Sequence, residues 1–156
     1  RHKERRSVPG TAHLDTSDIW IRYNSLDNLH DYEKFTGEHD SVWHDAYYKL
    51  PELRPIIFGL MARCCAVRLG GILITKIPAG KAVLPHSDAG WHPEYYNTKI
   101  YVPIQTNNQC INRVVDEYAI MEAGSAWYFN NLVEHEVINN GDTDRISLIV
   151  CMRCDG

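Results

Sequence analysis

Two histidines and an aspartate stand at a spacing that could hold one metal ion. One residue separates His86 from Asp88, and His135 follows much later in the chain. Because side chains alternate along a strand, one strand can present His86 and Asp88 on the same face, and a distant strand can add His135. Two imidazoles and one carboxylate, with other positions left open, form the facial set of non-haem Fe(II) oxygenases. The sequence therefore predicts an iron site at these three residues.

An arginine ten residues after the second histidine indicates what else binds there. The planar fork of Arg145 can grip a carboxylate at two points, such as the far end of 2-oxoglutarate. With Fe(II) this predicts an oxygenase that uses 2-oxoglutarate as co-substrate together with O2. The metal and the co-substrate supply the chemistry, so the chain needs no acid–base pair and no nucleophile.

Short strand-like segments after Gly70 must position these residues. They are rich in β-branched and aromatic side chains and are separated by turn signals. Strands are expected over 72–77, 82–88, 98–106, 114–121, 125–129, 135–139 and 145–153. Such spacing, without helices in between, predicts a mainly β sandwich or barrel. Three segments precede this part of the chain. They are an earlier strand over 18–23, a stretch without a clean hydrophobic period over 24–50 and an amphipathic helix from Leu53 to Cys64.

One turn matters most for the geometry of the site. Asn139-Asn140-Gly141-Asp142 carries an Asn-Gly signal, which predicts that 135–139 and 145–153 form an antiparallel hairpin. At ~3.3 Å per residue, Arg145 would then lie on the order of 10 Å along from His135. A metal-chelated five-carbon diacid and an extended guanidinium could span that distance.

Length and composition favour a single domain over 1–156. Residues 1–15 are expected to be a flexible segment, and 70–154 the strand core. The chain is 44% hydrophobic, and its net charge of −4 gives no support for a nucleic-acid partner. No apolar run approaches the ~20 residues of a membrane span, so we expect a cytoplasmic protein without a membrane partner. Five cysteines, two of them adjacent, argue against a secreted disulfide framework.

The stretch from Thr75 to Val150 resembles the aspartyl/asparaginyl β-hydroxylase family of Fe(II)/2-oxoglutarate oxygenases. The resemblance covers about half of the chain and includes the interval of ten between His135 and Arg145. It implies a double-stranded β-helix, a cupin-like jelly roll, with one or more flanking helices. The matching segments are 77–80, 85–88, 99–104, 134–137 and 144–145.

The resemblance also implies roles for single residues. His86, Asp88 and His135 correspond to the metal ligands and Arg145 to the residue that binds the distal carboxylate of 2-oxoglutarate. Three further positions are expected near the co-substrate. Thr75 takes the place of a hydroxyl residue that assists it, Tyr101 stands where the family often has histidine, and Ser147 forms an Arg-x-Ser pair known from other 2-oxoglutarate enzymes.

Two features lie next to the expected site in the sequence. Lys99 is expected on the opposite strand face from Tyr101, in solvent. The aromatic segment 91–96 follows the first ligands, where loops often carry substrate selectivity.

Several functions stay open at this point. The leading one is hydroxylation of an amino-acid side chain, free or within a peptide or protein, with conversion of 2-oxoglutarate to succinate and CO2. An alternative is demethylation of a nucleobase or protein by the same chemistry. Another is a non-catalytic, cupin-like sensing domain that keeps the metal. The chain is shorter than the family's membrane-anchored enzymes, so the substrate could be a small molecule or a peptide. The oligomeric state is not indicated.

Overall fold

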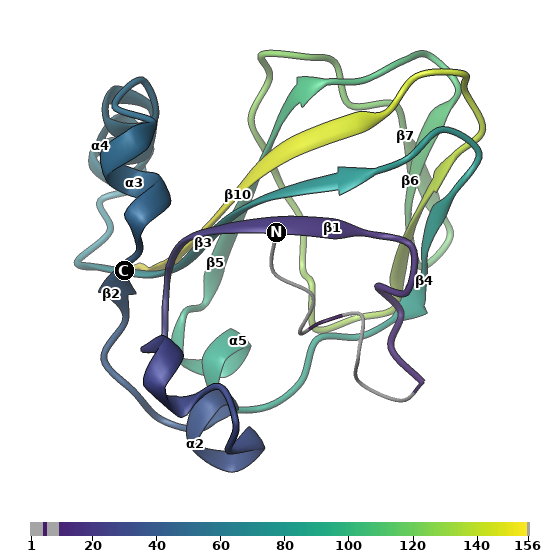
Figure 1. The fold of residues 1–156 in the computed structure, drawn as a ribbon. Helices are drawn as coiled ribbons and strands as arrows, with labels where there is room; N and C mark the ends of the chain where they lie inside the picture. Colours follow the sequence, from purple (N-terminus) through teal and green to yellow (C-terminus); the bar gives the residue numbers. More distant parts are fainter. Residues whose placement is uncertain (1–4, 6–9, 156) are drawn as a thin grey trace.

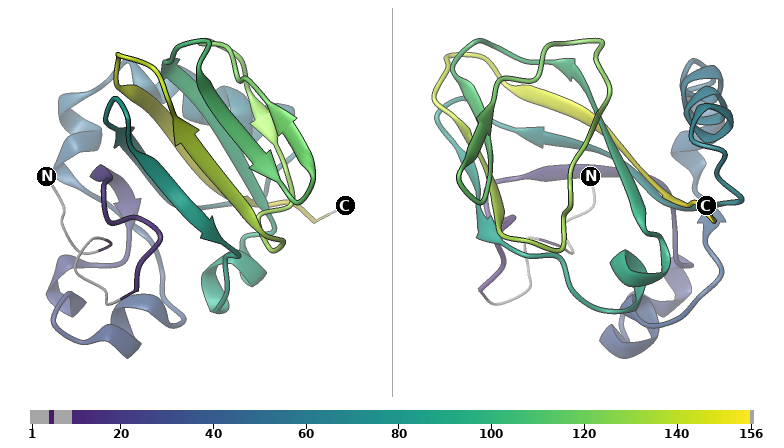
Figure 2. Two further views of the ribbon diagram at one scale, coloured as in Figure 1. Left: turned by 90° about the vertical axis from the view of Figure 1, so that its right-hand side faces the viewer. Right: turned by 180° about the vertical axis from the view of Figure 1, so that it is seen from behind.

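Two antiparallel β-sheets form the body of the protein (Figures 1 and 2). The computed structural model describes residue 5 and residues 10–155. One sheet has six strands in the order β2-β1-β3-β10-β5-β8, and the other has four in the order β4-β9-β6-β7. This confirms the predicted mainly β, jelly-roll fold class. The strands are β1 (Ser17–Tyr23), β2 (Val42–Trp43), β3 (Arg68–Ile77), β4 (Ala82–His86), β5 (Thr98–Gln105), β6 (Cys110–Val114), β7 (Glu117–Ala119), β8 (Trp127–Tyr128), β9 (His135–Asn139) and β10 (Arg145–Arg153).

The helices lie outside the two sheets. α4 (Leu53–Arg63) lies beside α3 (Asp45–Lys49) at the left of Figure 1, and it confirms the predicted amphipathic helix. Leu53 and Ile57 of α4 are buried against the six-stranded sheet. A short 3-10 turn (Leu26–Asn28), α2 (Tyr32–Thr36) and α5 (Trp91–Tyr95) complete the elements. None of the described helices has the length and apolar character needed to cross a bilayer.

The central strand β10 separates the core into two parts. Its residues Leu148, Val150 and Met152 pack with α4 on the outer face of the sheet. Ile149 and Cys151 belong to the cluster on the other face, which looks toward the four-stranded sheet. Alternation places Arg145 and Ser147 on this inner face as well. The space between the sheets therefore receives polar side chains from β10.

Two regions differ from the expected strands. The single strand expected over 114–121 is broken by a tight turn, in which Val115 adopts a positive φ of 53°, so that this region forms only the end of β6 and the paired strand β7. β-branched residues favour strands and rarely adopt a positive φ, so the sequence at Val115 predicted a continuous strand instead of a turn. The early strand expected over 18–23 is confirmed as β1, whereas β2 lies in the stretch 24–50 where no strand was expected; both extend the six-stranded sheet.

The expected flexible segment 1–15 falls partly on residues outside the described part of the chain, namely 1–4 and 6–9. Within the described part, the backbone carbonyl of Ala12 accepts a hydrogen bond from the N–H of Leu84 at 2.9 Å. This bond fastens residue 12 to β4.

The predicted hairpin between 135–139 and 145–153 is wrong. β9 pairs with β4 and β6, whereas β10 pairs with β3 and β5 in the other sheet. The connecting loop crosses between the sheets, and Gly141 does not take the positive φ that an Asn-Gly hairpin turn requires. Glycine is needed there for a different reason, because a Cβ would come within 2.2 Å of the Asn107 side chain. Turn residues alone could not distinguish a hairpin from a crossing loop.

The side chain of Asn139 fastens this crossing loop. It is fully buried, and its Nδ2 donates to the carbonyls of Ile77, Pro78 and Thr143 at 2.9–3.2 Å. Its Oδ1 accepts from Asn107 Nδ2 at 3.0 Å. The amide therefore ties the ends of β3 and β9 to the start of β10.

Loss of this amide should weaken the fold. Asn139→Ala leaves several buried carbonyls without a donor, and we expect it to lower the free energy of unfolding by about 2–3 kcal/mol. Urea unfolding followed by circular dichroism measures the change. The exposed neighbour Asn140 is the matched control, and Asn140→Ala should change the free energy by less than about 0.5 kcal/mol. Equal losses in the two variants would contradict the role of Asn139.

Candidate metal centre

His86, Asp88 and His135 come together as predicted. Their potential ligand atoms all lie within 4.8 Å of one another. His86 ends β4 and is the direct cross-strand partner of His135, which begins β9. Asp88 lies in the loop two residues beyond the end of β4, so the loop and not strand alternation turns its carboxylate toward the imidazoles. Its Oδ1 is 3.3 Å from His86 Nε2 and 3.9 Å from His135 Nε2.

Both imidazoles are held with the same nitrogen toward the carboxylate. His86 Nδ1 donates to the carbonyl of Leu84 at 2.8 Å, and His135 Nδ1 donates to the carbonyl of Val133 at 2.9 Å. A carbonyl can only accept, so Nδ1 carries the proton and Nε2 keeps its lone pair. Such backbone anchors are typical of metal-binding histidines. The donor set and its orientation fit a divalent metal of the iron type.

The electrostatics of the group also favour metal binding. Burial lowers the pKa of His135, which keeps its ring neutral. Burial by itself would raise the pKa of Asp88, but the Lys99 ammonium and the contact with His86 hold it well below its ordinary value. Neutral imidazole and ionised carboxylate are the forms that bind a metal. The pKa shifts of His135 and Asp88 therefore both favour the metal-binding form.

Lys99 lies in the site and not in solvent, so the expectation for this residue is wrong. Its Nζ is 2.6 Å from Asp88 Oδ2, and the side chain is only 17% exposed. Positions 99 and 101 are two residues apart, so alternation gives Lys99 and Tyr101 the same face of β5. The Lys99 ammonium lies 5.4 Å from the centre of the Tyr101 ring.

Arg145 is buried between the two sheets with little to neutralise it. It is 3% exposed, and its Nη2 donates to Asn112 Oδ1 of β6 at 3.1 Å. Among the described residues, no carboxylate forms an ion pair with it, and its Nε has no hydrogen-bond partner. A buried guanidinium without an anion is costly, since charge that leaves water must be compensated. The arrangement fits a carboxylate ligand that enters between the sheets.

The remaining predicted residues line the same interior. Thr75 and Ser147 are buried cross-strand partners on β3 and β10. Ser147 Oγ and Tyr101 Oη are buried without a partner among the described residues. Thr75 Oγ1 accepts from Arg5 Nη2 at 3.3 Å, and Arg5 itself pairs with the buried Asp18 at 2.6 Å. Their roles toward a co-substrate remain predictions.

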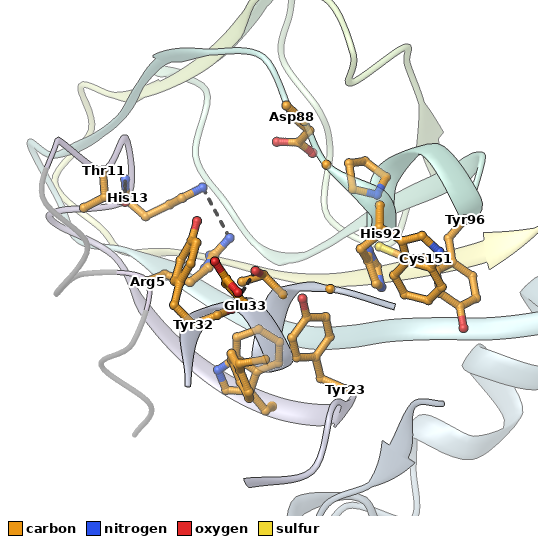
Figure 3. Close-up of a pocket in the computed structure, with 18 of the residues that line it drawn as sticks. Arg5, Thr11, His13, Tyr23, Tyr32, Glu33, Asp88, His92, Tyr96 and Cys151 are labelled. Carbon is orange, nitrogen blue, oxygen red and sulfur yellow. Dashed lines mark hydrogen bonds between the residues drawn. The ribbon is translucent and has the colours of Figure 1, made fainter. Parts of the chain in front are cut away.

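A cavity of about 900 Å³ opens beside the metal-binding group (Figure 3). Asp88 and Lys99 lie at its metal end, and the view shows Asp88 on the opposite side from Tyr23. His92, within the aromatic segment singled out in the sequence, comes from α5 and accepts a hydrogen bond from the N–H of Gly71 at 3.0 Å. Burial lowers the pKa of His92 to about 3, so the ring is neutral. The aromatic side chains that line the cavity, called the aromatic wall below, are Trp20, Tyr23, Tyr32, Phe35, Trp91 and Tyr96.

Four residues of the site were not found from the sequence. Lys99 could have been found from strict strand alternation with Tyr101. Asn131, which bonds Asp88, and Asn112, which bonds Arg145, carry no local signal because their partners are distant in the chain. His13 lines the cavity with its ring 5.0 Å from that of His86, and burial lowers its pKa to about 2. It too gives no sign in the sequence.

Comparison with known proteins identifies a family over nearly the whole chain. The sequence model described as aspartyl/asparaginyl beta-hydroxylase matches residues 12–153. No curated protein sequence matches the chain significantly.

Solved structures show only distant likeness. A cupin domain from Bordetella pertussis Tohama I has 17% identity and a TM-score of 0.44 over 56% of this chain and 84% of its own. A predicted oxalate decarboxylase from Thermotoga maritima has 19% identity and a TM-score of 0.44 over 61% and 72%. A cupin superfamily protein from Desulfitobacterium hafniense has 12% identity and a TM-score of 0.41 over 56% and 70%. These values are too low to indicate a ligand or an activity.

Proposed function

Because the chain belongs to the aspartyl/asparaginyl beta-hydroxylase family, we propose that it is an Fe(II)/2-oxoglutarate-dependent oxygenase that hydroxylates an amino-acid side chain, free or within a peptide. His86, Asp88 and His135 would hold the iron, and their donor atoms fit it. Arg145 would bind the distal carboxylate of the co-substrate. A cytoplasmic location remains a prediction from the sequence.

The observation that carries this proposal is the buried, uncompensated guanidinium of Arg145. The residue is only 3% exposed and lies in the same interior as the metal-binding group. Its Nε has no hydrogen-bond partner among the described residues. The hydroxyls of Ser147 and Tyr101 are also buried, and neither has a hydrogen-bond partner in the described part of the chain. A carboxylate is a good acceptor for such donors, because charge-assisted bonds to arginine are strong and can be bidentate. A diacid that reaches from the metal to Arg145 would satisfy them together.

The chain itself positions and shields the reaction. Fe(II), 2-oxoglutarate and O2, when bound, supply the oxidation of a C–H bond to C–OH, with succinate and CO2 as the other products. The backbone anchors of His86 and His135 keep the ligand nitrogens in place. The cavity beside Asp88 would bind the substrate against its aromatic wall, which removes apolar surface from water.

The alternatives fit these features less well. A domain that only binds or senses a metal has no use for a buried arginine between its sheets. A nucleobase demethylase needs a basic surface for its substrate, whereas the chain carries a net charge of −4. Hydroxylation of a small or peptide substrate accounts for both the metal-binding group and Arg145.

The proposal is tested by turnover. Protein loaded with Fe(II) without oxygen should convert 2-oxoglutarate to succinate when air is admitted, and one member of a panel of free amino acids and Asp- or Asn-containing peptides should accelerate it at least several-fold. Succinate is measured by mass spectrometry, with the hydroxylated product as the second readout. The control is the same protein without iron. Absence of 2-oxoglutarate binding to the loaded protein would contradict the proposal.

A further inference from the structure

The two oxygens of Asp88 have different surroundings. Oδ2 accepts hydrogen bonds from Lys99 Nζ at 2.6 Å and from Asn131 Nδ2 at 2.8 Å. Oδ1 instead faces the Nε2 atoms of His86 and His135 at 3.3 and 3.9 Å. The carboxylate therefore has one oxygen held by the protein and one directed at the two imidazoles.

The groups that hold Oδ2 are themselves fixed. Lys99 is the cross-strand partner of Cys151 within the six-stranded sheet, and its side chain is only 17% exposed. Asn131 is buried, and its backbone carbonyl also accepts a hydrogen bond from the N–H of Asp88 at 2.9 Å. Asp88 is thus fastened to a strand and to a second loop at the same time.

We propose that Lys99 is a positioning residue of the metal centre. Together with Asn131 it holds Oδ2, so that Asp88 gives a metal ion Oδ1 alone and leaves more positions open. Its ammonium also cancels the charge of Asp88, so the loaded centre keeps the full double charge of the cation for an anionic co-substrate. This inference rests on the proposed function, because 2-oxoglutarate is a dianion.

Removal of the Lys99 charge should change the affinities for the metal and for the co-substrate in different directions. Without the Lys99 ammonium, a divalent cation meets one positive charge fewer, so its affinity should stay equal or rise. A dianion then meets a less positive centre, so its affinity should fall. A lysine that only stabilised the fold would weaken both kinds of binding when removed. The two affinities therefore separate a positioning role from a structural one.

The experiment uses Co(II) as the metal probe and 2-oxoglutarate as the titrant, with binding followed by the visible absorption of cobalt. Lys99→Met should bind Co(II) at least as tightly as the wild-type protein and should need about tenfold more 2-oxoglutarate. Lys99→Arg keeps the charge and should stay within about threefold of wild type in both. The matched control is Lys76 of β3, whose Nζ lies 3.3 Å from Asp144 Oδ2. Lys76→Met should bind Co(II) and 2-oxoglutarate as the wild-type protein does.

The outcomes decide separately on the two proposals. Weaker Co(II) binding by Lys99→Met, or an unchanged requirement for 2-oxoglutarate, would overturn the role of Lys99 while the proposed function stands. If wild-type protein loaded with Co(II) takes up no 2-oxoglutarate, the proposed function and the charge balance for a co-substrate both fail. The Co(II) affinities of the variants still decide in that case whether Lys99 acts on the metal as inferred.

Discussion

Replacing Arg145 by methionine is expected to raise the concentration of 2-oxoglutarate needed for half-saturation by about 100-fold, while the metal stays bound. Truncating one partner of a buried, hydrogen-bonded charge pair costs 2–5 kcal/mol, and 100-fold corresponds to about 2.7 kcal/mol. Metal affinity should not change, because Arg145 contacts Asn112 and not the metal-binding group. Titration of the co-substrate into metal-loaded protein measures the effect.

The same substitution should not weaken the fold. Arg145 forms no ion pair with any residue that the structure describes, and replacing a buried charge with an apolar side chain of similar length is often neutral or stabilising. Arg145→Met without co-substrate should therefore unfold at the same temperature as the wild type or higher. A functional residue is often kept at such a cost in stability. Lower stability, by several kcal/mol, would show instead that Arg145 serves to join the sheets through Asn112.

Arg153 provides the matched control on the same strand. It lies at the other end of β10 and pairs with Asp155 at 2.8 Å near the surface. Arg153→Met should leave the 2-oxoglutarate requirement within about twofold, since an exposed ion pair contributes little. An equal rise in both variants would mean that the effect does not come from the site between the sheets.

His135→Ala is expected to lower metal affinity by more than about 100-fold and to abolish turnover. The substitution removes one of three donors, and even the loss of an outer partner of a metal ligand typically costs 10- to 100-fold. Metal content after equilibrium dialysis measures binding directly, so the test does not depend on the substrate. Because the His135 ring lies against Phe129 at 5.2 Å, circular dichroism must show that the variant keeps its fold.

The comparison variant for this test is His92→Gln. His92 is another shielded, neutral imidazole near the cavity, but it accepts a hydrogen bond from Gly71 and does not belong to the metal-binding group. Glutamine can still accept that bond, so the variant should keep its metal. If His135→Ala retained as much metal as the wild-type protein, His135 would not be a metal ligand, and the proposed iron centre would be contradicted.

The sequence by itself indicated which residues form the candidate site and most of the strands that carry them. His86, Asp88, His135 and Arg145 are visible because their types and spacing are local properties of the chain. The bounds of β9 and β10 agree with the expected segments for the same reason, since turn residues and β-branched runs mark them. The Arg-x-Ser spacing also agrees with the structure, because two residues apart on β10 means one face for Arg145 and Ser147.

Only the tertiary structure decided which strands pair and which side chains meet. The sequence around Gly141 looks like a hairpin turn, yet β10 pairs with β3 and β5 in the other sheet, and Gly141 lies closely against the Asn107 side chain. The contacts of Asp88 with Lys99 and Asn131, and of Arg145 with Asn112, join residues from separate strands and loops. Such partners depend on how the two sheets close around their common interior. The sequence alone gives the type and spacing of the polar side chains, whereas non-local packing decides which partner each of them contacts.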